Sequence, residues 1–240
     1  MLKFCVRLIA FVLTVWCWLT VLDARLSPAW SVAIMWGGVA LVPVAALAGR
    51  RVLDRRPQWD RDGWTTAALH YMVMILLGCA AMVAIRFGKD HPILSIPLSR
   101  QISGPVTMAL AVLAFGAVVN LAIQGLGAPF AVALSRRIAK GWLYARTRNP
   151  MVLGTLLFTV ALGFYLQSLQ VVLWAAAWAS PALLLMVRVY EERELEMRFG
   201  APYLEYKRRT PFLFPRLRRA GTRARPQTRA SYGGRTAPQS

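Results

Sequence analysis

Acidic residues and cysteines are scarce in this chain of 240 residues, and each shortage excludes a class of site. Asp and Glu together number 10 against 29 Lys and Arg, which gives a net charge of +19. The three cysteines, Cys5, Cys17 and Cys79, fall in apolar segments, and no pair of them has metal-ligand spacing. A disulfide framework is therefore not expected. We predict no metal site and interpret the cysteines as packing residues.

Several signatures of nucleotide binding and catalysis are also missing. The chain has no Walker loop, no dinucleotide fingerprint after a strand and no serine nucleophile elbow. The excess of basic residues would suggest nucleic acid in a soluble protein, but no aromatic-basic recognition motif accompanies it. Cytoplasmic loops of membrane proteins are rich in Lys and Arg. A membrane therefore explains the charge better, and we expect no nucleic acid partner.

Hydrophobic residues are abundant, at 57% of the chain, whereas a soluble domain has about 45–50%. They lie in blocks, which predicts an all-α fold, a polytopic membrane helical bundle. Six membrane spans are expected, at residues 2–22, 28–48, 64–85, 104–123, 151–166 and 169–187. Pro43 predicts a kink in the second span. A cleaved signal peptide is the alternative for the first, although no clear small-x-small cleavage site follows it.

Basic residues are distributed unevenly about these spans. Four of the 29 Lys and Arg fall on the side opposite the C-terminal tail, namely Arg25, Arg86, Lys89 and Arg100. The positive-inside rule then makes both termini cytoplasmic. The tail at residues 216–240 has seven arginines and cannot bury a core, so we expect it to be disordered and to rest on anionic lipid.

A charge-free stretch near the C-terminus predicts a helical hairpin. Residues 150–187 include no Asp, Glu, Lys or Arg over 38 residues, which is enough for two membrane helices. The second helix should continue to Phe199. From Leu169 that makes 31 residues, or about 46 Å at about 1.5 Å per residue. The hydrocarbon core is about 30 Å thick, so the last turns of this helix are expected to protrude into the cytoplasm.

The two feet of this hairpin are polar, and each has two interpretations. Asn149 and Pro150 suit the start of a helix, but the same free N–H groups, with the planar fork of Arg148, suit an anion. Glu191 and Glu192 could form ordinary helix-surface ion pairs with Arg188. Alternatively, one of the two carboxylates turns toward the other foot. Neighbours on a helix point about 100° apart, so both are not expected to face one ligand.

Other polar or aromatic residues are weaker candidates. His70 lies inside the third span, where a histidine is a functional candidate by default, but we favour a hydrogen-bonded packing role because no second ligand is in view. Asn120, near the end of the fourth span, could hydrogen-bond between helices. The aromatic residues at the hairpin feet could form an interfacial belt, or wall an adenine or a lipid tail. They are Trp142, Tyr203 and Tyr206.

Over residues 124–215 the chain resembles the isoprenylcysteine carboxyl methyltransferase and phospholipid methyltransferase superfamily, especially its bacterial membrane members. The shared pattern is a Gly-rich Ala-Pro-Phe loop, Arg-Asn-Pro-Met, a helical hairpin, Glu-Glu-x-x-Leu and Phe-Gly-x-x-Tyr-x-x-Tyr. This sequence supplies Gly125, Gly127, Ala128, Pro129, Phe130, Tyr144, Arg148, Asn149, Pro150, Met151, Glu191, Glu192, Leu195, Phe199, Gly200, Tyr203, Tyr206 and Pro211. Members that act on prenylated proteins have His at the place of Asn149, and the sequence departs from the pattern at Gly141, Val152 and Phe212.

The resemblance implies an enzyme of the bacterial inner membrane that transfers a methyl group from S-adenosylmethionine to a lipophilic or lipid acceptor. It divides the chain into membrane helices at 1–123, a catalytic region at 124–215 and the tail. The implied catalytic residues are Glu191, Glu192 and Arg198. The implied cofactor-binding residues are Gly127, Pro129, Tyr144, Arg148, Asn149, Pro150, Glu192, Tyr203 and Tyr206. The alternatives are an NADPH-dependent reductase of the sterol-reductase type and a non-catalytic membrane scaffold.

Overall fold

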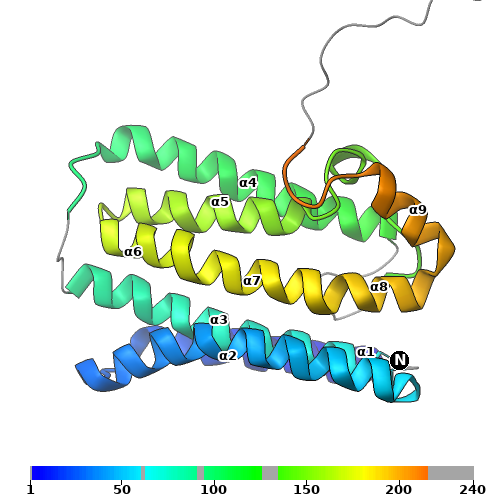
Figure 1. Cartoon of the computed structure of the whole chain (residues 1–240). Helices are drawn as coiled ribbons and strands as arrows, with labels where there is room; N and C mark the ends of the chain where they lie inside the picture. The colour runs from blue at the N-terminus through cyan, green and yellow to red at the C-terminus, as the bar shows by residue number, and fades with distance from the viewer. Residues whose placement is uncertain (1, 61–62, 91–94, 126–134, 216–240) are drawn as a thin grey trace, which may run out of the picture.

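The structure is a computed structural model that describes residues 2–60, 63–90, 95–125 and 135–215. Gly127, Pro129 and the tail at 216–240 lie outside the described residues. All the regular elements in the described part are helical (Figure 1), which confirms the all-α class. The four N-terminal helices are α1 (Leu2–Asp23), α2 (Pro28–Arg55), α3 (Trp64–Asp90) and α4 (Arg100–Gly125). Short 3₁₀ turns, η1 (Pro57–Asp60) and η2 (Trp142–Ala145), stand in the connections.

The C-terminal hairpin is formed by α5 (Pro150–Tyr165) and a continuous helical run from Leu169 to Phe199. That run comprises α6 (Leu169–Trp174), the π-helical turn η3 (Ala175–Ala179), α7 (Ser180–Met186), a second π-helical turn η4 (Val187–Glu191) and α8 (Glu192–Phe199). After Gly200, α9 (Ala201–Arg209) turns back, and Figure 1 shows it with the following segment over the start of α5.

The expected spans recur as helices, with later ends than predicted for several of them. Five helices of the described chain are long and apolar enough to cross a membrane, and α5, at 16 residues, is shorter. Helix α2 continues to Arg55 and runs without interruption through Pro43. Its last turns remain helical because Arg and Leu are good helix formers that need no apolar surroundings. The hydrophobic segments therefore predict where the helices lie, whereas the helix propensity of the flanking residues determines where they end.

Small residues let the helices approach closely. A Cβ built on Gly38 of α2 would stand 2.6 Å from the backbone oxygen of Leu76 on α3. A Cβ on Gly154 of α5 would stand 2.8 Å from the Cα of Ala114 on α4. Contacts of this kind are the usual means by which membrane helices associate. They fix the bundle around the buried side chains of α2, α3 and α7, such as Val42 and Met186.

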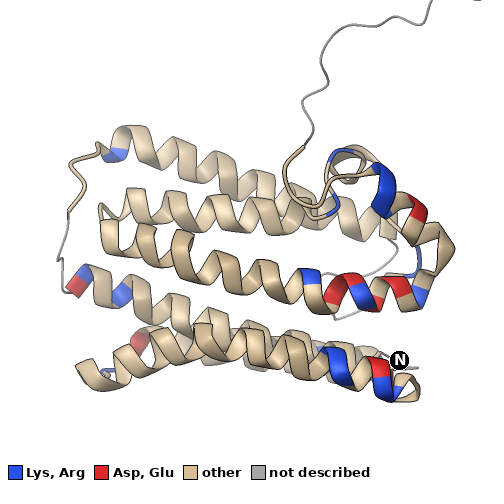
Figure 2. Ribbon diagram, in the orientation of Figure 1, with Lys and Arg blue, Asp and Glu red and all other residues tan. Residues whose placement is uncertain are grey.

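Figure 2 shows most of the charged segments at the end of the bundle where α8 and α9 lie, a few at the opposite end, at the end of α3 and the start of α4, and none in the middle of the visible helices. The other end holds the turn between α5 and α6, where Ser168 accepts from the N–H of Val171 and Gln167 has a φ of 58°. The charge-free hairpin therefore places Arg148 and Glu191 at the same, charged end. Ion pairs at this end include Asp54 of α2 with Arg193 of α8, at 2.8 Å.

Candidate functional site

A cavity of about 430 Å³ lies between α3, α5 and the run from α6 to α8. Most of its wall is apolar, with Val73 and Leu77 from α3, Leu156 from α5 and Leu183 from α7. One end is polar, and the side chains there come from segments far apart in the sequence. They are Thr66, His70, Tyr144, Arg148, Asn149, Glu191, Glu194 and Arg198. Small-molecule sites typically occupy about 300–1,000 Å³ with few polar groups among apolar ones, so the cavity has the size and character of a ligand site.

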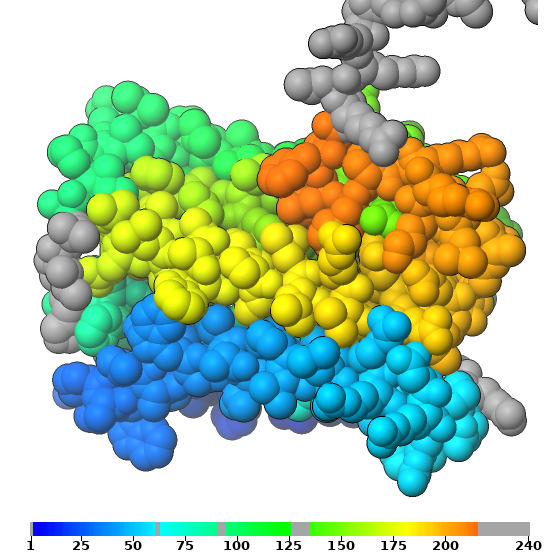
Figure 3. All heavy atoms as spheres, viewed as in Figure 1, coloured from blue at the N-terminus to red at the C-terminus, as the bar shows by residue number. Residues whose placement is uncertain are grey.

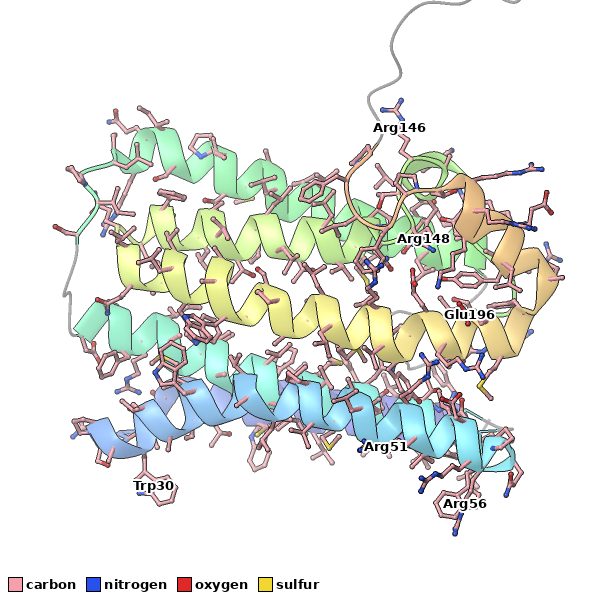
Figure 4. All side chains as sticks on the ribbon, viewed as in Figure 1. Trp30, Arg51, Arg56, Arg146, Arg148 and Glu196 are labelled. Carbon is pink, nitrogen blue, oxygen red and sulfur yellow. The ribbon has the colours of Figure 1, made fainter. Side chains whose placement is uncertain are left out.

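Arg148 is held in place from three sides. Its backbone N–H donates to the carbonyl of Pro211 at 2.9 Å, and its Nη2 lies 3.0 Å from Glu192 Oε1. Its guanidinium stands 5.7 Å from the ring centre of Phe212, and that of Arg188 stands 5.4 Å from the same ring. Figure 4 shows the Arg148 side chain within the bundle, whereas Arg146, two residues earlier, extends outward. The contacts with Pro211, Glu192 and Phe212 therefore orient the Arg148 side chain into the bundle.

The guanidinium of Arg148 retains two unused donors. The side chain is 9% exposed, and its Nε and Nη1 have no hydrogen-bond partner among the residues that the structure describes. A buried N–H without an acceptor costs about 1–3 kcal/mol, and more on a charged group. An anion in the cavity would remove this cost, since the guanidinium fork matches a carboxylate in two-point contact.

Glu192 is the carboxylate that turns toward the other foot. It is 4% exposed, and its Oε2 lies 2.7 Å from Lys207 Nζ of α9, opposite its contact with Arg148. Burial lowers the pKa of Lys207, but the carboxylates of Glu192 and Glu196 outweigh burial, so the pKa lies above its ordinary value. Glu192 does not line the cavity. The two ion pairs of Glu192, with Lys207 and with Arg148, therefore connect α9 and α8 to the start of α5.

Asn149 has a different role from the capping that its position suggests. It stands at the N-cap of α5, but its side chain makes no capping hydrogen bond, and Nδ2 donates to the carbonyl of Phe212 at 2.9 Å. Thr147 reaches the same carbonyl at 3.3 Å. Pro150 occupies the first helical position, as expected. In the space-filling view the segment after α9 lies against this foot (Figure 3), so the C-terminal segment covers the polar end.

Tyr144, Tyr203 and Tyr206 pack together next to the polar end of the cavity. Tyr206 donates its hydroxyl to the carbonyl of Tyr144 at 2.7 Å, and the rings of Tyr203 and Tyr206 lie 6.1 Å apart. Burial raises the pKa of all three phenols. Tyr144 lines the cavity, whereas Tyr203 and Tyr206 do not. Direct contact of Tyr203 and Tyr206 with a cofactor thus stays a prediction.

Glu191 faces a partner that the sequence did not identify. Its Oε1 lies 2.8 Å from Nε2 of His70, and both side chains line the cavity. Glu191 ends the π-helical turn η4, a type of irregularity that is frequent at functional sites. A histidine within a membrane span was the available signal. Its partner depends on α3 packing beside the end of α7, which no local pattern reveals.

The third pair at the polar end is Glu194 with Arg198, one helical turn apart on α8. Both line the cavity. Of the residues implied by the resemblance, the structure therefore brings Tyr144, Arg148, Asn149, Glu191 and Arg198 to the cavity. Pro150, Glu192, Tyr203 and Tyr206 do not line the cavity, although Glu192 contacts Arg148 and Tyr206 contacts Tyr144.

The donor set fits S-adenosylmethionine. The buried, unused donors of Arg148 suit its carboxylate, and the carboxylate of Glu194 suits its ammonium or ribose hydroxyls. The apolar wall suits a nucleoside or an acceptor. Within the described residues, no group of three or more His, Cys, Asp or Glu is placed to hold a metal ion.

Comparison with known proteins gives one short similarity. A stretch of 89 aligned residues is 38% identical to methanethiol S-methyltransferase 2 of Bradyrhizobium diazoefficiens (strain JCM 10833 / BCRC 13528 / IAM 13628 / NBRC 14792 / USDA 110). It covers 31% of this chain and 27% of that protein, so the chain matches about a quarter of the relative's length. No family model and no solved structure matches the chain. Part of the chain is thus similar to a protein named as a methyltransferase.

Proposed function

We propose that the protein is a multi-pass membrane methyltransferase that uses S-adenosylmethionine and methylates a lipophilic or membrane-delivered acceptor. The observation that supports this most is the buried guanidinium of Arg148, with two unused donors at the polar end of a largely apolar cavity. The similarity to a protein named as a methyltransferase points to the same activity.

In this proposal the chain binds and orients, because methyl transfer depends on positioning more than on covalent chemistry by the protein. The bound cofactor supplies a methyl group on a positively charged sulfur. Arg148 holds the cofactor's carboxylate, and Glu192 keeps Arg148 pointed inward. Glu194 and Arg198 flank the opposite side of the polar end. The apolar wall excludes water and admits the acceptor from the bilayer.

The relative's name also suggests a class of acceptor. Because that protein is named for methanethiol, we propose a small apolar thiol as the acceptor here. A short thiol suits a cavity of about 430 Å³ that also has to contain the cofactor. We further propose that the charged end of the bundle faces the cytoplasm of a bacterial inner membrane, where S-adenosylmethionine is made.

Calorimetry on the detergent-solubilised full chain tests the proposed function. S-adenosylmethionine and S-adenosylhomocysteine should bind, and Arg148→Ala should weaken both by about 10- to 100-fold, as expected for a charge-assisted contact. Arg146→Ala is the matched control, because this exposed guanidinium leaves the same turn but points outward. Binding of NADPH alone would favour a reductase, and no binding at all would favour a scaffold. Equal affinity in parent and Arg148→Ala would contradict the site.

A further inference from the structure

The pair formed by His70 and Glu191 is not explained by cofactor binding. The two residues come from helices 121 positions apart in sequence and meet at 2.8 Å in the wall of the cavity. Their side chains are 22% and 27% exposed, so neither is sealed in the core nor free in solvent. The opposite carboxylate, Glu192, already pairs with Arg148 and Lys207. Glu194, the other carboxylate of the cavity wall, pairs with Arg198 on its own helix. Glu191 is therefore the lining carboxylate without an arginine or lysine partner among the ion pairs of the described residues.

The hydrogen bonds of His70 determine which ring nitrogen holds a proton. Nδ1 lies 2.8 Å from the carbonyl oxygen of Thr66. A carbonyl oxygen only accepts, so Nδ1 carries a hydrogen. Nε2 faces the Glu191 carboxylate at 2.8 Å, and two bare lone pairs at that distance would repel. Another proton therefore lies between Nε2 and Oε1, in addition to the hydrogen on Nδ1. The Glu191 carboxylate can still accept a proton from an acceptor molecule.

The position of the ring is fixed from the start of α3. The carboxylate of Asp60 accepts from the backbone N–H of Thr66 at 2.9 Å and from its hydroxyl at 2.7 Å. The hydroxyls of Thr66 and Tyr190 lie 3.0 Å apart, and the Tyr190 ring packs edge-on to His70 at 6.4 Å. This network anchors the Thr66 carbonyl that accepts the hydrogen bond from Nδ1–H. It also packs the ring directly beside η4, from which Glu191 projects.

We infer that Glu191 is the proton acceptor for a weakly acidic nucleophile, a thiol in the proposed function, and that His70 is the residue that positions Glu191 for this step. The inference rests on the proposed function, because it names the acceptor chemistry of the same cavity. It limits acceptors to those that must lose a proton when they are methylated.

The chemistry balances in atoms and charge. The S–H bond of the acceptor breaks, its electron pair stays on sulfur, and the proton moves to the Glu191 carboxylate. That sulfur pair forms the new bond to the methyl carbon, while the donor sulfur keeps the electron pair of the bond that breaks and loses its positive charge. Glu191 loses its negative charge in the same event. The net charge within the cavity is therefore unchanged.

Nitrogen-15 spectroscopy of histidine-labelled protein tests this without turnover. The chain has two histidines, so His91→Asn assigns the signals. With S-adenosylhomocysteine bound, ethanethiol should shift the Nε2 resonance of His70, whereas dimethyl sulfide, which has no S–H, should not. In Glu191→Gln the ethanethiol shift should disappear. Equal shifts with both sulfur compounds in the parent, or a retained thiol shift in Glu191→Gln, would overturn the inference.

Turnover with two acceptors provides a second test. General base catalysis contributes about 10²- to 10⁴-fold. Glu191→Gln should therefore lower methylation of ethanethiol by about 100-fold or more, and lower methylation of an alkylselenol, which ionises without a base near neutral pH, by less than about 10-fold. His70→Gln should show the same acceptor dependence with a smaller loss. An equal loss for both acceptors would contradict the proton role.

Two controls separate the possible failures. Glu205→Gln removes a carboxylate of the same kind from the exposed face of α9, where it pairs with Arg209, and should match the parent in every assay. Glu191→Gln should still bind S-adenosylhomocysteine within about 10-fold, which shows that it folds. If the parent does not bind S-adenosylhomocysteine, the proposed function and the inference both fail. If the parent binds it and Glu191→Gln methylates ethanethiol as the parent does, only the inference fails.

Discussion

Replacement of Glu192 by Gln should destabilise the fold far more than the loss of an ordinary ion pair. Glu192 is 4% exposed and lies between two cations, 3.0 Å from Arg148 Nη2 and 2.7 Å from Lys207 Nζ. Lys207 is 32% exposed and keeps Glu196 at 2.8 Å, so it retains a counter-charge in the variant. Arg148 is 9% exposed and has no second carboxylate among the ion pairs of the described residues. The cost therefore falls mainly on Arg148.

The size of the effect follows from that burial. Removing one partner of a buried ion pair costs about 3–5 kcal/mol, because an uncompensated charge remains. The amide of Gln still offers an oxygen to the guanidinium, so we expect the lower end, about 3 kcal/mol. For a chain of this size each kcal/mol shifts the unfolding midpoint by about 2–4 °C. Glu192→Gln should thus unfold about 6–12 °C below the parent.

Thermal unfolding in detergent, followed by circular dichroism, measures this difference. Glu205→Gln is the reference, because its pair with Arg209 is 51% exposed on the carboxylate side and such pairs contribute about 0–1 kcal/mol. Lys207→Met should give an intermediate loss. If Glu192→Gln unfolds within about 2 °C of Glu205→Gln, the buried pair does not hold the polar foot together, and the argument from charge burial is refuted.

Three further predictions rest on separate features of the structure. Gly38→Ala should destabilise by about 1–3 kcal/mol, since its Cβ would meet Leu76 at 2.6 Å, whereas Gly37→Ala, with nothing within 4 Å, should be neutral or gain up to about 1 kcal/mol in chemical unfolding. Burial raises the pKa of Tyr206, so its contribution to stability is complete below about pH 10 and lost as pH rises through the folded value. Tyr206→Phe should thus lower the free energy of unfolding by about 1 kcal/mol at pH 7, because the hydrogen bond to the Tyr144 carbonyl is lost. Between pH 9 and 11 the denaturation midpoint of Tyr206→Phe should fall by less than that of the parent. S-adenosylhomocysteine at about 100 times the parent's dissociation constant should stabilise the parent by about 2.7 kcal/mol in thermal scans, and Arg148→Ala, which binds it about 10- to 100-fold more weakly, by only about 0.4–1.4 kcal/mol.

The fold was largely predictable from the sequence, because length and hydrophobicity determine where a membrane helix can lie. The charge-free residues 150–187 indicated a hairpin, and the structure has α5 turning into α6 at Gln167 and Ser168. The π-helical turns were not predictable in this way. Two features coincide with η3: Pro181 has no N–H to donate, and both the backbone N–H and the hydroxyl of Ser180 donate to the Ala175 carbonyl, the hydroxyl at 2.7 Å.

The candidate site was predictable in part. Arg148 and Glu192 lie at opposite feet of the hairpin, so their contact required no knowledge of how the remaining helices pack. The contact of Glu191 with His70 could not be predicted without knowing that α3 packs beside η4. The sequence therefore favoured a packing role for His70 and gave no indication of this contact. Asn149 shows a similar limit, because its bond to Phe212 depends on a segment 63 residues later that folds back over the foot.

The cavity also bears on the expected division of the chain at residue 123. Its wall includes Trp18 of α1, His70 and Val73 of α3, and Leu121 of α4, all of which precede that boundary. Helix α3 supplies the partner of Glu191 and one side of the apolar wall, so the region at 124–215 alone has neither. The residues that carry the family resemblance all lie within 124–215, which include the polar foot, and none lies within residues 1–123. Enzymes that share a cofactor need the same polar groups to bind it, whereas enzymes with different acceptors need apolar walls of different shape. We therefore expect the first 123 residues to determine which acceptor enters the cavity.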